Sequence, residues 1–205
     1  LVKKDISTVK IVMSGAGAAG TAVARLLVKS GAKNIIAFDK DGAINASRSR
    51  EDEMRAWFID HSNPTNFAGD IHEAMSGADV FIGVSAPNVL TEADIASMGA
   101  KSIVFALANP DPEVDPVVAR KYAAVVATGR SDQPNQINNV LAFPGIFRGL
   151  LDAQAHKITD DLLIAAANAI ADCVSASQLN ASFIVPSVFN PQVVTKVAAA
   201  VKASV

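Results

Sequence analysis

The stretch VKIVMSGAGAAGTAVARLLVKSGAKNIIAFD, which runs from Val9 to Asp39, decides the fold of this chain. Its first part, Val9–Ser14, is a short apolar run that ends at glycine, which is typical of a buried parallel strand. Apolar residues then recur at helical spacing over Ala18–Ser30, and Gly31 is the residue type that commonly follows a helix. A second apolar run, Ile35–Asp39, completes strand, helix and strand within about 30 residues. We therefore predict a right-handed βαβ unit here.

The turn between the first strand and the helix has the spacing G-x-G-x-x-G, in Gly15-Ala16-Gly17-Ala18-Ala19-Gly20. In such a turn the first glycine allows a tight bend, the second leaves room for a pyrophosphate, and the third lets helix and strand approach closely. Backbone N–H groups at the start of the helix then bind the phosphates. The motif alone is a weak signal, but here it follows a strand and opens a helix. We therefore predict that these six residues bind a dinucleotide.

Asp39 indicates which dinucleotide is bound. It ends the second strand, 19 residues beyond Gly20. A carboxylate at this place is expected to accept hydrogen bonds from the adenosine ribose and to repel a 2′-phosphate, so the sequence favours NAD. Lys40, Arg48 and Arg50 lie nearby in the sequence, which leaves NADP open as an alternative.

The rest of the chain continues the alternation of strands and helices. Further strands are predicted at Val80–Val84, Ser102–Ala108 and Val125–Thr128, and helices at Glu51–Ile59, at Ile71–Met75, after Thr91, from Asp115, from Thr159 to about Ser177, and from Asn190 to about Lys202. A third strand near His61 is left open. We predict an α/β fold with a doubly wound, mostly parallel sheet of the Rossmann type, and a single domain over residues 1–205 with additional C-terminal helices.

Polar segments follow three of the predicted strands, at the edge where open α/β sheets bind ligands. Val84, Ser85 and Ala86 follow one strand, Asn109 follows the next, and Asn139 comes after the last. Asn is also an ordinary turn residue, so a turn role is the alternative. An Asn amide at this edge can donate to a carboxylate or a carboxamide without adding charge. We therefore expect these five residues to line the cofactor site.

The composition excludes several classes of protein. Half of the residues are hydrophobic and 19% are charged, which fits a sheet covered on both faces and excludes global disorder. The net charge is −2 without a basic run, so no nucleic-acid partner is expected. No apolar run is long enough to span a membrane. Cys173 is the only cysteine and is expected to pack within a helix; it fits a reducing compartment, and we expect a cytoplasmic protein.

The sequence contains no evident catalytic or metal-binding group. His61, His72 and His156 are scattered without the spacing of metal ligands. Lys121 and Tyr122 are expected on one helix, where neighbours in sequence point apart, so they are not expected to act as a pair.

Five segments together resemble the NAD(P)-binding domain of malic enzymes, particularly the shorter bacterial type. They are Val9–Gly20, Asp39–Ile44, Gly77–Pro87, Phe105–Pro110, and Thr128–Arg130 with Asn138–Arg148. This family oxidatively decarboxylates (S)-malate to pyruvate and CO₂ with NAD(P) and Mg²⁺ or Mn²⁺, which polarises the developing keto oxygen. The resemblance implies that Asn109 and Asn139 contact the substrate and the nicotinamide end of the cofactor, and that Asp39 contacts the ribose.

The resemblance also implies what this chain does not contain. In the family the catalytic Tyr and Lys and the three carboxylate metal ligands precede the glycine-rich loop, whereas here Asp5 is the only acid among the 14 residues before Gly15. We therefore expect no catalytic residue and no metal ligand in this chain. It would be part of a longer enzyme, with the metal ligands elsewhere, and the intact enzyme would be a homodimer.

Two alternatives stay open. One is the cofactor domain of an amino-acid dehydrogenase of the glutamate or leucine type, and the Asn pair that precedes Phe143-Pro144-Gly145 argues against it. The other is a free-standing NAD-binding module that senses redox state or regulates a partner.

Overall fold

The computed structural model describes all 205 residues and divides them into two compact units. One unit comprises Val2–Pro134, and the other comprises Asn135–Val205 together with Leu1. The first unit contains two hydrophobic clusters and the second contains one. None of the helices combines the length and the apolar character that crossing a membrane requires.

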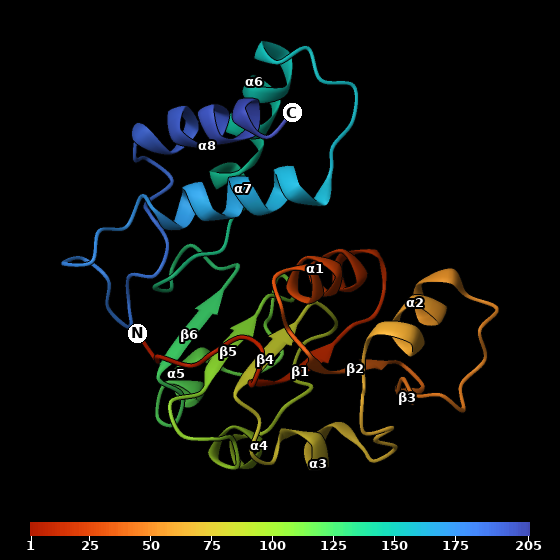
Figure 1. Cartoon of the computed structure of the whole chain (residues 1–205). Coiled ribbons are helices and arrows are strands. Elements are labelled where there is room, and N and C mark those ends of the chain that lie inside the picture. The colour runs from red at the N-terminus through yellow and green to blue at the C-terminus, as the bar shows by residue number, and fades with distance from the viewer. The chain divides into compact units, whose positions relative to one another are not determined.

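The first unit is built on a six-stranded sheet (Figure 1). Its strands are β1 (Lys10–Ser14), β2 (Asn34–Asp39), β3 (Gly42–Ala43), β4 (Val80–Gly83), β5 (Ile103–Ala106) and β6 (Val125–Thr128). They lie in the order β3-β2-β1-β4-β5-β6, and every neighbouring pair is parallel except β2 and β3. The order reverses at β1, which lies between β2 and β4. The predicted doubly wound, mostly parallel sheet is confirmed.

Helices cover both faces of this sheet (Figure 1). The helices are α1 (Ala18–Lys29), α2 (Glu53–His61), α3 (Ile71–Met75), α4 (Glu92–Ala96) and α5 (Pro116–Ala119). Because successive side chains of a strand point to opposite faces, Ile11 and Met13 of β1 belong to the hydrophobic cluster that includes residues of α1 and α2, while Val12 belongs to the cluster that includes residues of α3, α4 and α5. Because these strands are buried on both faces, their sequences are continuous apolar runs.

At two positions of the turn from β1 to α1, glycine is the only residue that fits. Gly15 has φ +102°, and a Cβ there would lie 2.6 Å from the carbonyl oxygen of Val84. A Cβ on Gly20 would lie 1.9 Å from the carbonyl oxygen of Gly15. The missing side chains therefore let the first turn of α1 approach the ends of β1 and β4.

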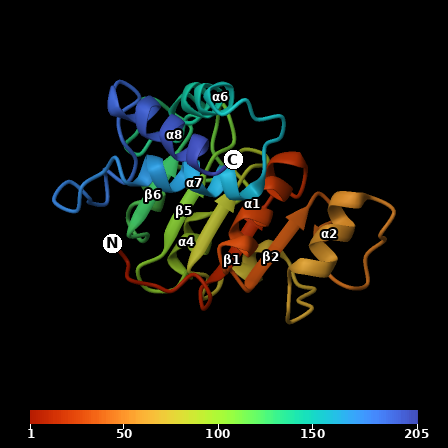
Figure 2. The same cartoon turned by 45° about the horizontal axis from the view of Figure 1, so that its top comes forward.

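The second unit is helical. It contains the 3₁₀ helix η1 (Asn139–Leu141) and the helices α6 (Phe143–Asp152), α7 (Asp160–Ala171) and α8 (Gln192–Ala203), and α8 packs against both α6 and α7 (Figure 2). Gly145 and Gly149 of α6 face α8, where a Cβ would come within 2.5 Å of Val197 Cβ and 2.6 Å of Val201 Cβ, respectively. The two glycines thus allow the close contact between these helices.

One C-terminal helix is shorter than predicted, because α7 ends at Ala171 and not near Ser177. The backbone N–H and the hydroxyl of Ser175 both donate to Gln178 Oε1, at 3.2 and 2.9 Å. Such local bonds compete with the helical ladder. Cys173 therefore lies just beyond the helix and not within it, half-buried, and its thiol donates to the carbonyl of Ala169.

The segment near His61 forms no strand. The edge of the sheet is instead the short antiparallel β3, which returns directly from β2. Asn63, with φ +52°, occupies the place where a further strand was left open, and its N–H donates to the carbonyl of Ile35 at 2.6 Å. Its side-chain amide donates to the carbonyls of Ile44 and Phe67. The segment is therefore a turn that is hydrogen-bonded to β2 and to the residue that follows β3.

The expected placement of Lys121 and Tyr122 on a helix was wrong. The helix α5 ends at Ala119, because only one turn follows its N-cap Asp115, and both residues lie beyond it. Lys121 Nζ and Tyr122 Oη donate to the same atom, Glu92 Oε1, at 3.1 and 2.8 Å. The hydrogen bond to Glu92 and the charge of that carboxylate raise the pKa of the Tyr122 hydroxyl above its ordinary value, against the opposing charge of Lys121.

The glycine turn yields a stability prediction. Gly20→Ala places a methyl group against the carbonyl oxygen of Gly15, which is part of the backbone and cannot move aside as a flexible side chain can. We therefore expect a loss of about 1–3 kcal/mol in the free energy of unfolding. Gly17→Ala is the matched control, because a Cβ there meets nothing within 4 Å and φ is −80°. Urea unfolding of both variants measures the difference. Equal stabilities would contradict the packing role of Gly20.

Candidate functional site

The site lies at the carboxyl edge of the sheet in the first unit. The ends of β1, β2, β4 and β5 place the glycine loop, Asp39, the segment Val84–Ala86 and Asn109 along this one edge. The glycine loop follows β1, where the strand order reverses, and open α/β sheets bind their ligands at this topological position. Asn139 belongs to the second unit.

The glycine loop leaves the start of α1 open to an anion. Gly17 is the N-cap residue, no side chain caps the helix, and its first turn contains no acidic residue. The first N–H groups of a helix have no partner within the helix and carry its positive dipole end. The open space at Gly17 is the room that a pyrophosphate needs, so the loop fits the phosphates of a dinucleotide.

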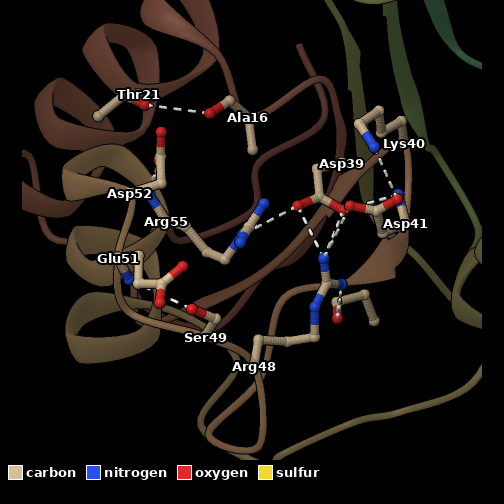
Figure 3. Close-up of polar contacts among 11 residues, drawn as sticks. Ala16, Thr21, Asp39, Lys40, Asp41, Arg48, Ser49, Glu51, Asp52 and Arg55 are labelled. Carbon is tan, nitrogen blue, oxygen red and sulfur yellow. Dashed lines mark hydrogen bonds and ion pairs between the residues drawn. The ribbon is translucent and has the colours of Figure 1, made fainter.

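Asp39 is held by two arginines at the end of β2 (Figure 3). Arg48 Nη2 lies 3.0 Å from each carboxylate oxygen, and Arg55 Nε lies 3.2 Å from Oδ2. The N–H of Asp41 donates to Oδ1 at 2.9 Å. All three charged side chains are mostly buried, with exposures of 17% for Asp39, 19% for Arg48 and 24% for Arg55. The carboxylate is therefore fixed in position next to two cations.

These contacts set the charge of the carboxylate. Burial raises the pKa of Asp39, but the hydrogen bond from the Asp41 N–H and the contacts with Arg48 and Arg55 outweigh burial, so its pKa lies below the ordinary value. Asp39 is therefore ionised at neutral pH. Its stabilising contribution is present above the pKa of an unfolded Asp and is lost as the pH falls through the lowered folded value.

Sequence reasoning identified only part of this cluster. Arg48 and Arg50 were named only as neighbours of Asp39 in the sequence; the structure brings Arg48 to Asp39, whereas Arg50 pairs with Asp60, its Nη2 lying 2.6 Å from Oδ1. Arg55 was missed, because it lies 16 residues from Asp39 on α2 and only the packing of that helix brings the two together. The available signal was its place in the first turn of a helix that follows the second strand.

The loop after β4 is bonded to the end of β1. The N–H of Val84 donates to the carbonyl of Ser14 at 2.9 Å, and the hydroxyls of Ser85 and Ser14 lie 2.8 Å apart. Ala86 follows on the exposed side of the loop. The predicted segment Val84–Ala86 therefore lies directly beside the glycine loop.

Asn109 lies just beyond β5, with its side chain exposed at the same edge, and its peptide bond to Pro110 is cis. Sequence reasoning missed a residue beside it: Glu113 is fully buried and accepts the N–H of Ala108 at 3.0 Å. Its surroundings, PDPEVDP, are typical of a solvated turn, so nothing in the local pattern indicated a buried carboxylate.

The Asn pair of the second unit divides into two roles. Asn138 is the N-cap of η1, and its side-chain oxygen accepts the N–H of Val140 at 3.0 Å. Asn139 begins η1 and is exposed. The local structure therefore uses Asn138 as a cap and leaves the Asn139 amide at the surface.

A polar cleft of about 280 Å³ lies between the loops that follow β4, β5 and β6. Its lining includes Arg130, Gln133, Asp111 and Asp115. The guanidinium of Arg130 holds the pKa of the Asp132 carboxyl at about 2. No group of three or more His, Cys, Asp or Glu side chains is arranged to hold a metal ion.

The chain matches known proteins over its whole length. The family described as "Malic enzyme, NAD binding domain" matches residues 1–205. An NAD-dependent malic enzyme of Geobacillus stearothermophilus is 48% identical over 201 residues, which are 98% of this chain and 42% of that enzyme. An NADP-dependent malic enzyme of Rhizobium meliloti is 42% identical over an alignment of 219 residues, which covers 98% of this chain and 28% of that enzyme.

Solved structures agree with this match. The crystal structure of the NAD-dependent malic enzyme of Thermotoga maritima superposes with a TM-score of 0.92 at 42% identity, and the match covers 99% of this chain and 54% of that one. The chain thus spans about half or less of the length of the relatives that it matches. It belongs to the malic enzyme family, of which it is the NAD-binding domain.

Proposed function

We propose that the protein to which this chain belongs oxidatively decarboxylates (S)-malate to pyruvate and CO₂, with NAD as the hydride acceptor. The observation that carries the proposal is the 48% identity, across nearly the whole chain, to an enzyme named for this NAD-dependent reaction. The open glycine loop and the ionised Asp39 support it, because one suits a pyrophosphate and the other a ribose with a free 2′-hydroxyl.

In this proposal the chain binds the cofactor and orients its nicotinamide. Gly15 to Gly20 hold the pyrophosphate, Asp39 holds the ribose, and Val84–Ala86 form the wall beside the nicotinamide ribose. Asn109 and Asn139 donate their amides to malate or to the nicotinamide carboxamide. A divalent metal, when bound, stabilises the enolate formed as CO₂ leaves. Its ligands, the acid–base pair, the homodimer and the cytoplasmic location remain predictions about the intact enzyme.

Membership in the malic enzyme family removes the amino-acid dehydrogenase alternative. The free-standing regulatory module differs from the enzyme in one measurable respect, because it binds NAD without turnover. An activity assay of the full-length protein therefore separates the two.

The activity prediction compares the full-length protein with the 205-residue chain. With malate, NAD and Mg²⁺, the full-length protein should form NADH, measured by absorbance at the nicotinamide band. The isolated chain should bind NAD in calorimetry without forming NADH, because acid–base groups alone supply about 10²–10⁴ in rate and the family's groups precede the glycine loop. Malate-dependent NADH formation by the isolated chain would show that it contains its own catalytic groups. A full-length protein that binds NAD without turnover would favour the regulatory module.

The Asp39 cluster yields a prediction on cofactor choice. Asp39 repels a 2′-phosphate, but Arg48 and Arg55 beside it can receive one as soon as the carboxylate is removed. Calorimetry should therefore show tighter binding of NAD than of NADP to the unaltered protein. Asp39→Ala should narrow or reverse the difference by strengthening NADP binding. Adding Arg48→Gln to Asp39→Ala should remove the gain in NADP affinity. Adding Arg50→Gln to Asp39→Ala should leave that gain unchanged, because Arg50 is paired with Asp60. Equal affinities for NAD and NADP before mutation would contradict the role of Asp39.

The two asparagines yield a prediction on malate kinetics. Asn109→Ala and Asn139→Ala, made separately in the full-length protein, each remove one hydrogen bond to a charged or strongly polar group. Such a loss costs about 1.5–3 kcal/mol, or roughly ten- to a hundredfold in kcat/KM for malate. Asn138→Ala is the control, because its side chain caps η1. If kcat/KM for malate stays within about twofold of that of the unaltered enzyme, Asn109 and Asn139 only form part of their loops and do not bind malate.

A further inference from the structure

Glu113 is a charged side chain with no exposed surface, located between two loops of the cofactor edge. Its Oε1 accepts the N–H of Ser85 at 2.9 Å and the Ser85 hydroxyl at 3.3 Å. Its Oε2 accepts the N–H of Ala108 at 3.0 Å. One carboxylate thus bonds to the loop after β4 with one oxygen and to the loop after β5 with the other.

The donors around Glu113 suit a carboxylate and no other common side chain. A carboxylate only accepts hydrogen bonds, and its two oxygens can accept from two directions at once; all three of the groups bonded to Glu113 are donors. No cation is among them, so the charge is held by oriented backbone N–H groups and a hydroxyl. A buried charge is retained only where such partners compensate it.

The backbone around Glu113 ties the same two loops together. Its carbonyl accepts the N–H of Leu90 at 2.9 Å, and the N–H of Leu107 donates to the carbonyl of Gly83 at 2.9 Å. A Cβ on Gly83 would lie 2.2 Å from the carboxyl carbon of Glu113, so the strand end is a glycine at the place where the carboxylate lies against it. The two residues therefore fit each other sterically.

The bonded network continues to the glycine loop. Ser85 Oγ, which donates to Glu113, also lies 2.8 Å from the hydroxyl of Ser14, the residue before Gly15. Glu113 thereby connects the ends of β1, β4 and β5. Asn109 is the residue immediately after Ala108, so its backbone position depends directly on the bond from Ala108 to Glu113.

We propose that Glu113 is a positioning residue of the nicotinamide half of the cofactor site: it sets the distance between the Ser85 loop and the Asn109 loop, without touching cofactor or substrate. The inference rests on the proposed function, in which these loops receive the nicotinamide and malate. Displacing a substrate-orienting group by about 1 Å can lower a rate about a hundredfold. A substitution of Glu113 should therefore lower the rate of malate oxidation by more than its effect on stability accounts for.

The test uses the full-length protein with Glu113→Gln. The substituted amide has one oxygen and one NH₂, and the NH₂ faces a backbone N–H that it repels, so one loop is released. Two ligands separate the halves of the site: NAD, and ADP-ribose, which has the same pyrophosphate and adenosine ribose but no nicotinamide. We expect Glu113→Gln to weaken NAD binding about tenfold and ADP-ribose binding less than about twofold, and to lower kcat for malate about ten- to a hundredfold.

Two further variants serve as controls for the Glu113→Gln measurements. Gly17→Ala should weaken NAD and ADP-ribose equally, because its methyl group fills space at the pyrophosphate. Glu73→Gln, the same substitution at an exposed glutamate of α3, should change neither affinity. If Glu113→Gln does not fold, Ser85→Ala removes one of its three donors and should show a smaller loss that is again confined to NAD.

The outcomes separate the inference from the proposed function. Equal weakening of NAD and ADP-ribose by Glu113→Gln, or unchanged kcat and unchanged NAD affinity, would overturn the positioning role. An unaltered protein that binds NAD no more tightly than ADP-ribose would also overturn it. An unaltered protein that binds NAD more tightly than ADP-ribose, but does not oxidise malate, would overturn the proposed function and leave the positioning role supported by the binding ratios.

Discussion

The close contact between the β1–α1 turn and the end of β4 is the constraint on which the first unit depends. Gly15 adopts a φ of +102° beneath the carbonyl of Val84, and Gly20 lies against the carbonyl of Gly15. No side chain fits into either contact. Because the helix starts so close to the two strands, its free N–H groups are directed to the edge of the sheet, where the strand order reverses and a ligand can enter.

The charges along this edge are arranged in different ways at its two ends. At β2, Asp39 is compensated by two guanidinium groups, which keep it ionised while adding positive charge next to the expected ribose. Between β4 and β5, Glu113 is compensated by N–H and hydroxyl groups alone. The first arrangement can exchange partners when a ligand arrives, because arginine side chains move. The second is part of the backbone hydrogen bonding and is expected to stay rigid.

The different compensation also explains how much substitution each end can tolerate. Removing Asp39 leaves two arginines that are partly solvated and can bind an anion, so the site changes its preference. Removing the charge of Glu113 leaves the buried N–H of Ala108 and the partly buried N–H of Ser85 without their carboxylate acceptor, so the site changes its shape. Cofactor choice and cofactor geometry are therefore controlled by separate residues on one sheet edge.

The sequence by itself determined the parts that depend on local pattern. The glycine spacing, the apolar runs and the helix caps were sufficient to predict the Rossmann-type sheet, the dinucleotide loop, and through several segments together the family. These features are readable because a strand buried on both faces and a phosphate-binding turn each restrict the residue types at consecutive positions.

Only the tertiary structure decided which distant side chains meet. Arg55 reaches Asp39 from α2, Lys121 and Tyr122 converge on Glu92, and Glu113 bridges loops that are 28 and 5 residues away. The local sequence around Glu113 is typical of an exposed turn, because burial is a property of what packs over a residue and not of its neighbours in the chain. Long-range pairing of charges and N–H groups leaves no periodic signal, so it becomes visible only when the sheet has brought the strand ends together.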